Sequence, residues 1–218
     1  VPHPDAARVR ADFDRIARLG PPRDVDRVTR ALLEDLGPPR TALDVGCGGG
    51  ALCRWLAERG VDVVGVDLSP QMLVQARRAD ARGRARYVEA DLFGYTPDAP
   101  FDLVVSVATL HHAPLGPALD RLRRWVAPGG ALVVHDLVRS TAPWERAVDA
   151  VAALAELPRG LVRFRDDDLR RAWRRHGAHD VYPSLGEVRA AVARHVPGAR
   201  VRRHLRWRYS LVWRAPAP

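Results

Sequence analysis

Three glycines at alternate positions, Gly46, Gly48 and Gly50, follow a short apolar run that contains Asp44. Glycine lets the backbone come close to a ligand where a Cβ atom would clash. The G-x-G-x-G spacing differs from the G-x-G-x-x-G that seats a pyrophosphate, and no Gly-Lys-Ser/Thr follows, which excludes a P-loop. We interpret the segment as a ligand-binding loop of another type; the alternative is a turn whose glycines serve only tight packing.

Two acidic residues close later apolar runs: Asp67 ends VDVVGVD, and Asp91 ends RYVEAD. A carboxylate at the position of Asp67 can accept hydrogen bonds from two ribose hydroxyls, and Asp91 can accept one from an exocyclic amine. The alternatives are an acid at a helix start beside the N-cap Ser69, and an ordinary turn residue at Asp91.

Three histidines fall where proton-transfer chemistry would need them. His111 and His112 follow the run FDLVVSVATL, and His135, with Asp136 next to it, lies near the end of GALVVHDLV. Histidine titrates closest to neutral pH, so it suits the removal of a proton from a hydroxyl. We predict that at least one of His111, His112 and His135 is catalytic; the alternative is packing or loop capping.

The elements that must position these residues alternate between strand and helix. Five apolar runs are expected as strands, at 41–46, 61–67, 86–91, 101–110 and 130–138. The runs are too continuous for strands with one face in water, so they predict an α/β fold with a doubly wound, mostly parallel sheet. Ligands bind such sheets at the carboxyl ends of the strands, which brings the loop, the acids and the histidines to one edge.

The remaining segments complete a single domain over 1–218. It divides into N-terminal helices (1–40), the core (41–139), a helical cap (140–198) and antiparallel edge strands (199–218). Helices are predicted over 5–19, 24–36, 143–157, 166–176 and 184–195. The last segment alternates with period two and predicts two strands with a tight turn near 204–206. One strand face would hold Val201, Leu205, Trp207, Tyr209, Leu211 and Trp213.

The core segments LDVGCGGG, VVGVDLSPQMLVQA, YVEADL, FDLVVSVATLHH and LRRWVAPGGALVVHD resemble class I S-adenosylmethionine (SAM) methyltransferases, in their small-molecule, quinone-biosynthesis-like (type 11) branch. The resemblance implies a Rossmann-like methyltransferase fold, SAM as cofactor and S-adenosylhomocysteine as product. It places the cofactor-binding residues at Asp44, Gly46, Cys47, Gly48, Gly50, Asp67, Leu68, Met72, Asp91, Leu92 and Ser106. Asp44 and the loop backbone would hold the methionine end, and Asp67 the ribose. Leu68 and Met72 would flank the adenine, whose edge Asp91 and Leu92 would bind.

Two absences narrow the chemistry within that family. The [DNS]-P-P-[YFW] motif of exocyclic-amine methylation would follow the fourth strand, where the chain reads Ser106-Val107-Ala108-Thr109. The metal-dependent catechol mechanism needs an Asp-Asn pair, and the chain contains no asparagine. We therefore expect no metal ion in that arrangement.

The net charge of +9 first suggests nucleic acid, but its distribution argues against that partner. Residues 1–158 hold 20 arginines and 21 acidic residues, whereas 159–218 hold 15 and 5. Every basic residue is arginine, which is typical of a GC-rich genome. Two cysteines without metal-ligand spacing, and no membrane-spanning run or secretory leader, lead us to expect a cytoplasmic protein.

Aromatic and basic side chains gather in the predicted cap. The aromatic residues are Trp144, Phe164, Trp173 and Tyr182; the arginines are Arg163, Arg165, Arg170, Arg171, Arg174 and Arg175. They would either contact an aromatic or anionic acceptor, or form the packing and solvated faces of the cap helices.

The sequence predicts methyl transfer from SAM to a small molecule, preferably to an oxygen of a specialised metabolite, by in-line displacement with a histidine base. An RNA methyltransferase that uses the arginine-rich C-terminal region is the second hypothesis. A SAM-binding protein with a non-methylating reaction or interaction role is the third. The chain would act as a monomer or a homodimer.

Overall fold

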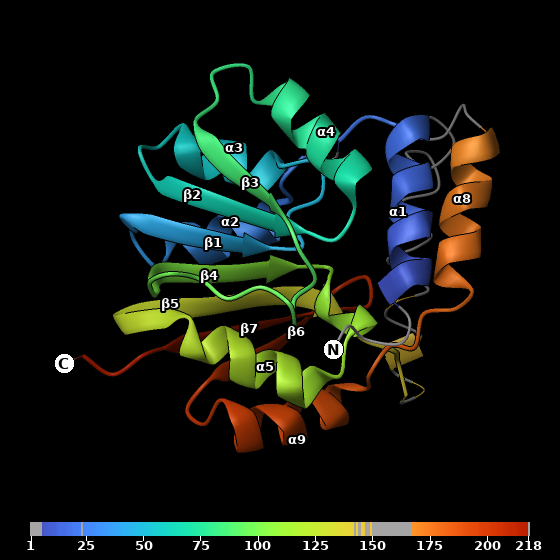
Figure 1. Ribbon diagram of the computed structural model, residues 1–218. Coiled ribbons are helices and arrows are strands. Elements are labelled where there is room, and N and C mark those ends of the chain that lie inside the picture. The colour runs from blue at the N-terminus through green and yellow to red at the C-terminus, as the bar shows by residue number, and fades with distance from the viewer. Residues whose placement is uncertain are drawn as a thin grey trace.

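Seven strands form one sheet in the order β3-β2-β1-β4-β5-β7-β6 (Figure 1). The computed structural model describes residues 6–22, 24–141, 143, 145, 146, 149 and 167–217. The strands are β1 (Thr41–Val45), β2 (Asp62–Asp67), β3 (Ala85–Glu89), β4 (Phe101–Val107), β5 (Val126–Leu137), β6 (Arg200–His204) and β7 (Arg208–Arg214). β1 to β5 pair in parallel, and β7 and β6 follow antiparallel. The predicted mostly parallel sheet with an antiparallel C-terminal edge is confirmed.

Both faces of the sheet are buried, which explains the continuous apolar runs. Along β5, Leu132 and Val134 pack with the core under α5 (Leu115–Arg124) and α9 (Leu185–His195). Ala131 and Val133 point the other way, toward α2 (Arg27–Glu34) and α3 (Ala51–Ala57). Consecutive residues of a strand therefore serve different faces, which also decides where the polar residues at the end of β5 go.

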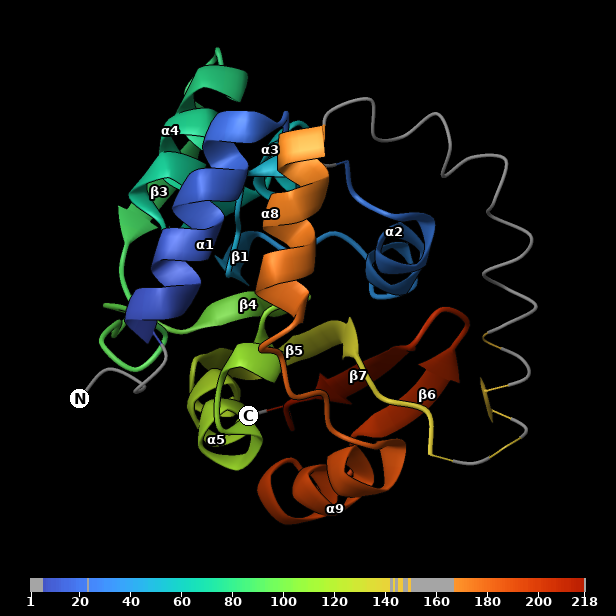
Figure 2. The ribbon, with the colours of Figure 1, turned by 90° about the vertical axis from the view of Figure 1, so that its right-hand side faces the viewer.

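Two helices lie over the edge toward which β1 and β4 point (Figure 1). α1 (Ala6–Leu19) and α8 (Asp167–Gly177) run side by side in front of that edge (Figure 2). An apolar cluster of Ile16, Ala17 and Ala172 joins them to Met72 of α4 (Pro70–Ala79). The segments before and after the core thus cover the edge at which the candidate residues were expected.

Several boundaries differ from the predicted ones. α2 begins at Arg27 rather than at 24, because Asp26 serves as its N-cap and accepts from the N–H groups of Val28 and Thr29. β5 begins at Val126, four residues before the predicted start at 130, and ends at Leu137. The predicted helix over 143–157 lies largely outside the described residues, as do Trp144, Phe164, Arg163 and Arg165.

The C-terminal strands form the predicted hairpin, but two residues expected on its apolar face do not lie there. Leu205 and Trp207 belong to the connecting turn and are 62% and 43% exposed. The left-handed backbone of Arg206 and Trp207, with φ of 64° and 55°, reverses the chain and breaks the two-residue alternation. Only the strand residues, such as the buried Tyr209 and Leu211, keep the expected face.

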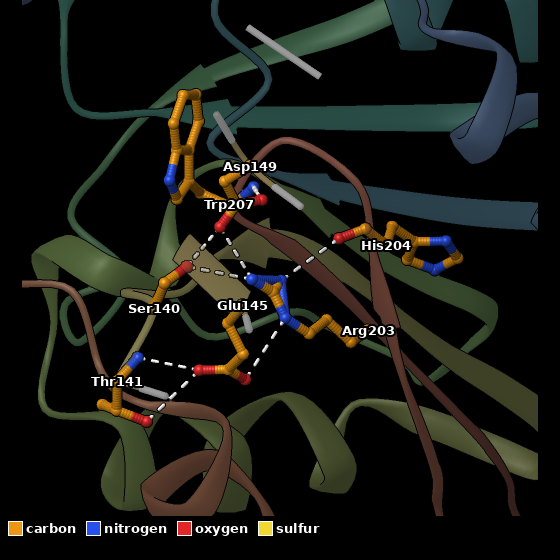
Figure 3. Close-up of polar contacts among 7 residues, drawn as sticks. All are labelled: Ser140, Thr141, Glu145, Asp149, Arg203, His204 and Trp207. Atoms are coloured by element: carbon orange, nitrogen blue, oxygen red, sulfur yellow. Dashed lines mark hydrogen bonds and ion pairs between the residues drawn. The ribbon is translucent and has the colours of Figure 1, made fainter. Parts of the chain in front are cut away.

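One arginine of the C-terminal region joins the hairpin to the chain that follows β5. Arg203 on β6 forms ion pairs with Asp149 at 2.8 Å and Glu145 at 3.4 Å, and donates to Ser140 Oγ (Figure 3). Its side chain is only 13% exposed. Arg203 therefore ties the chain after β5 to the hairpin, and is not part of a solvated basic face.

Candidate functional site

The glycine loop after β1 is held against the end of β2. Gly46 and Cys47 donate their N–H groups to Val66 O at 2.8 and 3.1 Å, and the Gly48 N–H donates to Asp67 Oδ2 at 2.8 Å. A Cβ atom built on Gly48 would meet nothing within 4 Å, so the loop is open on that side. Sequence positions 46–50 and 67, which were expected to share one site, are thus in direct contact.

Two carboxylates lie at this loop, the buried Asp44 and the half-buried Asp67. Asp44 is 2% exposed, and burial raises its pKa to about 7, although a hydrogen bond from the Cys53 thiol at 3.3 Å acts in the opposite direction. Burial likewise raises the pKa of Asp67 to about 6, against the N–H donors of Ser69 and Gly48. Both groups would gain from a ligand that supplies positive charge or hydroxyl donors.

The other predicted cofactor residues have different surroundings. Ser106 is fully buried and donates its hydroxyl to Val45 O at 3.0 Å, which joins β4 to β1. Met72 is buried beneath α1 and α8. Asp91 accepts from the N–H of Phe93 at 2.7 Å, and Leu92 packs on the core beside α5. Leu68, between Asp67 and Ser69, is partly exposed.

Substitution of Gly46 by alanine should damage this loop. Gly46 has φ +76°, and its Cβ would lie 2.1 Å from Thr109 Oγ1. We expect a loss of at least about 2 kcal/mol in the free energy of unfolding, combining backbone strain and the clash. Gly60 is the matched control, because it has φ +83° with nothing within 4 Å of its Cβ. Thermal melting of both variants checks this; equal losses would show that the Thr109 contact does not matter.

His111 forms a close pair with Asp136 at the end of β5. Its Nδ1 lies 2.6 Å from Asp136 Oδ1, and its backbone N–H donates to Asp136 Oδ2 at 3.1 Å. Asp136 is 1% exposed; burial opposes its charge, but the His111 ring and the N–H donors hold the pKa of this carboxyl below its usual range. An ionised Asp136 fixes the proton on Nδ1 and leaves Nε2 as a proton acceptor.

The His111–Asp136 pair lines a cavity of about 330 Å³. The walls are mainly apolar and aromatic, formed by Leu110, Ala113, Leu115, Leu137, Val181, Tyr182, Pro183, Ala191 and Tyr209, with Arg139 and Glu187. Tyr182, expected as a pocket aromatic, is one of them. Trp173 instead packs against Phe13 between α1 and α8.

His112 belongs to a polar chain that reaches the covering helices. Its Nδ1 lies 3.4 Å from Asp180 Oδ1, and Asp180 Oδ2 lies 3.5 Å from Nε2 of His176 on α8. His176 Nδ1 in turn lies 3.5 Å from Asp12 on α1. The histidine rings of 111 and 112 are 3.9 Å apart between centroids. The segment after β4 is therefore connected to both covering helices.

His135 lies apart from this group. It is 1% exposed, and its Nδ1 lies 2.8 Å from Oγ1 of Thr29, which itself donates to Asp26 at 2.6 Å. As neighbours on β5, His135 and Asp136 point to opposite faces, so His135 reaches α2 while Asp136 reaches His111. The structure thus brings His111 and His112 together, and places His135 elsewhere.

Asp180, His176 and Thr29 were not singled out from the sequence. Asp180 and His176 are 68 and 64 positions from His112 in the chain, and an isolated Asp or Thr carries no spacing signal. The larger cavity, of about 550 Å³, opens at the opposite edge beside Arg40, Asp102 and Gly129, and is lined by none of the predicted site residues. None of the described helices has the length and apolar character that a membrane crossing requires.

Comparison with known proteins gives consistent matches. The family described as "Methyltransferase domain" matches residues 43–134. An uncharacterized methyltransferase of Mycobacterium bovis is 35% identical over 196 residues, covering 85% of this chain and 93% of that protein. A ubiquinone biosynthesis O-methyltransferase of Methylococcus capsulatus is 35% identical over 153 residues, or 65% of this chain and 64% of its own length.

Solved structures share the fold. The N-methyltransferase NodS of Bradyrhizobium japonicum, in complex with S-adenosyl-L-homocysteine, aligns with a TM-score of 0.63 and 17% identity, covering 95% of this chain and 98% of that one. The magnesium protoporphyrin IX methyltransferase of Synechocystis with bound SAM has the same TM-score, at 16% identity and 98% coverage of both chains.

Proposed function

The chain belongs to the SAM-dependent methyltransferase family, and from this premise we propose that it methylates a hydroxyl oxygen of a small molecule bound beside His111. The observation that carries the proposal is the His111–Asp136 pair at 2.6 Å on the wall of a 330 Å³ cavity. The likeness to a ubiquinone biosynthesis O-methyltransferase supports oxygen as the acceptor atom.

The residues at the glycine loop fit SAM. Gly48 leaves room beside Asp67, whose carboxylate is available for ribose hydroxyls, and buried Asp44 would gain from the amino group of the methionine end. SAM supplies a methyl group on a positively charged sulfur, which is the electrophile. A Cβ built on Gly46 would meet Thr109, which stands two residues before His111, and this supports our placing the acceptor close to the loop.

The chain's own residues supply position and a proton acceptor. The acceptor hydroxyl would donate to His111 Nε2, while Nδ1–H of the same ring donates to Asp136. SAM would supply the methyl group for the oxygen; the proton of the hydroxyl would pass to His111 Nε2, and the Asp136 carboxylate would stabilise the resulting imidazolium. Burial of the pair excludes water and strengthens this stabilisation.

The cavity walls suggest the kind of acceptor. Tyr182, Tyr209 and Leu115 offer apolar surface for a flat ring. Arg139 lines the same cavity and is therefore the candidate contact for an anionic group on the acceptor, which would share this arginine with Glu187, its ion-pair partner at 2.9 Å. A specialised metabolite with a phenolic hydroxyl and a carboxylate combines these features.

Two assays test the proposal. Calorimetric titration with SAM should show one site per chain, and incubation with SAM and a panel of phenols and hydroxy acids should yield S-adenosylhomocysteine and a methylated product by mass spectrometry. Failure to bind SAM or S-adenosylhomocysteine would overturn the cofactor site. Binding without turnover would favour the non-methylating alternative, and turnover only with RNA at moderate salt would favour the RNA methyltransferase.

A further inference from the structure

We propose that His111, His112 and Asp180 form a binding site for a first-row transition-metal ion of the Zn²⁺ type, and that this ion blocks the proposed base. Within the described part of the chain, these three are the group whose potential ligand atoms all lie within 4.8 Å of one another. Their side chains are 5%, 9% and 2% exposed. The inhibitory part of the proposal rests on the proposed function; the binding part does not.

The spacing of the ligands is close to that of an assembled site. His112 Nδ1 and Asp180 Oδ1 lie 3.4 Å apart, and two ligands on one tetrahedral ion with bonds of about 2.1 Å lie about 3.4 Å apart. The third ligand, His111, is the residue before His112 in the short helix Leu110–His112. Small side-chain rotations would close the remaining distance.

Two of the three proposed ligands, His111 and Asp180, already have a hydrogen-bond partner outside the site. Nδ1 of His111 is hydrogen-bonded to Asp136, which leaves Nε2 to bind an ion. In carboxylate–histidine–metal arrangements of this kind, the carboxylate fixes the orientation of the ligand ring. Asp180 Oδ2 accepts from the Tyr182 hydroxyl at 3.1 Å, which leaves Oδ1. The ligand atoms are thus oriented by contacts that the fold provides.

The cluster also contains buried polar atoms without hydrogen bonds. They include His112 Nε2 and Asp180 Oδ1. Of these two atoms, Asp180 Oδ1 is a ligand atom of the proposed site, whereas His112 Nε2 lies on the other side of its ring from the proposed ligand Nδ1. Buried polar groups are normally satisfied, so the missing hydrogen bond of Asp180 Oδ1, on a side chain that is 2% exposed, indicates that something further binds here. Two imidazoles and one carboxylate suit Zn²⁺, Co²⁺ or Ni²⁺, whereas Mg²⁺ prefers oxygen ligands alone.

An ion in this position would compete with the proposed mechanism. The lone pair on His111 Nε2 can accept the acceptor's proton or bind the metal, but not both. Zn²⁺ should therefore inhibit methyl transfer reversibly, and a chelator should restore it. No group is oxidised or transferred in this step.

The binding arm uses the full chain freed of metal with EDTA and titrated calorimetrically with ZnCl₂ or MgCl₂, without SAM or acceptor. We expect one Zn²⁺ per chain and no Mg²⁺ binding. Asp180→Asn and His112→Asn should each weaken Zn²⁺ by about tenfold or more. His195→Asn is the control, since His195 on α9 pairs with Asp120 on α5 and is not among the proposed ligands. Thermal melting verifies that each variant folds; two variants are used so that misfolding of one leaves the other decisive.

A spectroscopic arm separates this site from the buried thiols Cys47 and Cys53. Co²⁺ bound to the histidine site should lack the charge-transfer absorption of cobalt–thiolate bonds. A thiolate signature, no stoichiometric Zn²⁺ binding, or equal affinity in the wild type and both site variants would overturn the proposal.

The inhibition arm measures turnover with and without Zn²⁺. Wild-type activity should fall and return with EDTA, and Asp180→Asn should need about tenfold more Zn²⁺ for the same fractional loss. Tight binding without inhibition would overturn the blocking role alone. Absence of methyl transfer in EDTA would instead count against the proposed function and leave the binding result standing.

Discussion

Replacement of His111 by alanine is expected to lower kcat by about 10²- to 10⁴-fold, the usual contribution of a positioned general base. The loss has a specific cause: His111 lines the cavity, and its Nδ1 lies 2.6 Å from Asp136 Oδ1, which leaves Nε2 to accept the proton in the proposed mechanism. SAM affinity should remain close to that of the wild type, because the glycine loop and Asp67 do not contact the His111 side chain. Steady-state rates by S-adenosylhomocysteine release, with SAM titration by calorimetry, separate the two effects.

Two further variants show whether the fall in kcat comes from the loss of the base or from a loss of stability. His195 also pairs with an aspartate, Asp120 on α5 at 2.8 Å, but it does not line the cavity. His195→Ala should therefore leave kcat within about twofold. His135→Ala should mainly cost stability, about 1–3 kcal/mol, because Thr29 would lose a buried partner. If His135→Ala lowered kcat as much as His111→Ala with no loss of stability, the base would have to be reassigned.

The arrangement of the fold could be predicted from residue patterns because each pattern has a local cause. Runs such as residues 101–107 are apolar on both faces, which only a covered parallel sheet accommodates, and Ser69 before Pro70 is a strong helix start. The contact of Gly48 with Asp67 followed from the same reasoning, since neighbouring parallel strands end at one edge.

The acceptor side could be predicted only in part, because its partners come from distant segments. Spacing placed His111, His112 and His135 at the carboxyl edge, but alternation along β5 sends His135 and Asp136 to opposite faces, and which helix covers each face depends on packing. Asp180 approaches His112 because α1 and α8 pack across the edge. The exposure of Leu205 and Trp207 could not be predicted either, because no glycine in the sequence marks the left-handed turn that contains them.

Replacement of Asp67 by asparagine is expected to weaken SAM binding by about tenfold to a hundredfold at pH 7. Hydrogen bonds to a charged group contribute about 1.5–3 kcal/mol, and the amide cannot accept from two ribose hydroxyls as strongly as the carboxylate. Asparagine keeps one oxygen for the Gly48 N–H, so the glycine loop should survive, although the amide NH₂ cannot also accept from the Ser69 N–H. Calorimetric titration with SAM measures the change, and kcat at saturating SAM should fall far less than in His111→Ala.

The pH dependence of binding gives this prediction a second, independent signature. Burial raises the pKa of Asp67 to about 6 in the free protein, so the carboxylate is present at pH 7 and mostly protonated at pH 5. Since the ionised form binds the ribose more strongly, SAM affinity should fall by about tenfold from pH 7 to pH 5 through this group alone. Asp44, with a pKa raised to about 7, should add to the fall, and Asp67→Asn should retain only that part. Asp62→Asn, at the exposed opposite end of β2, should match the wild type at both pH values; an equal loss there would assign the effect to overall charge.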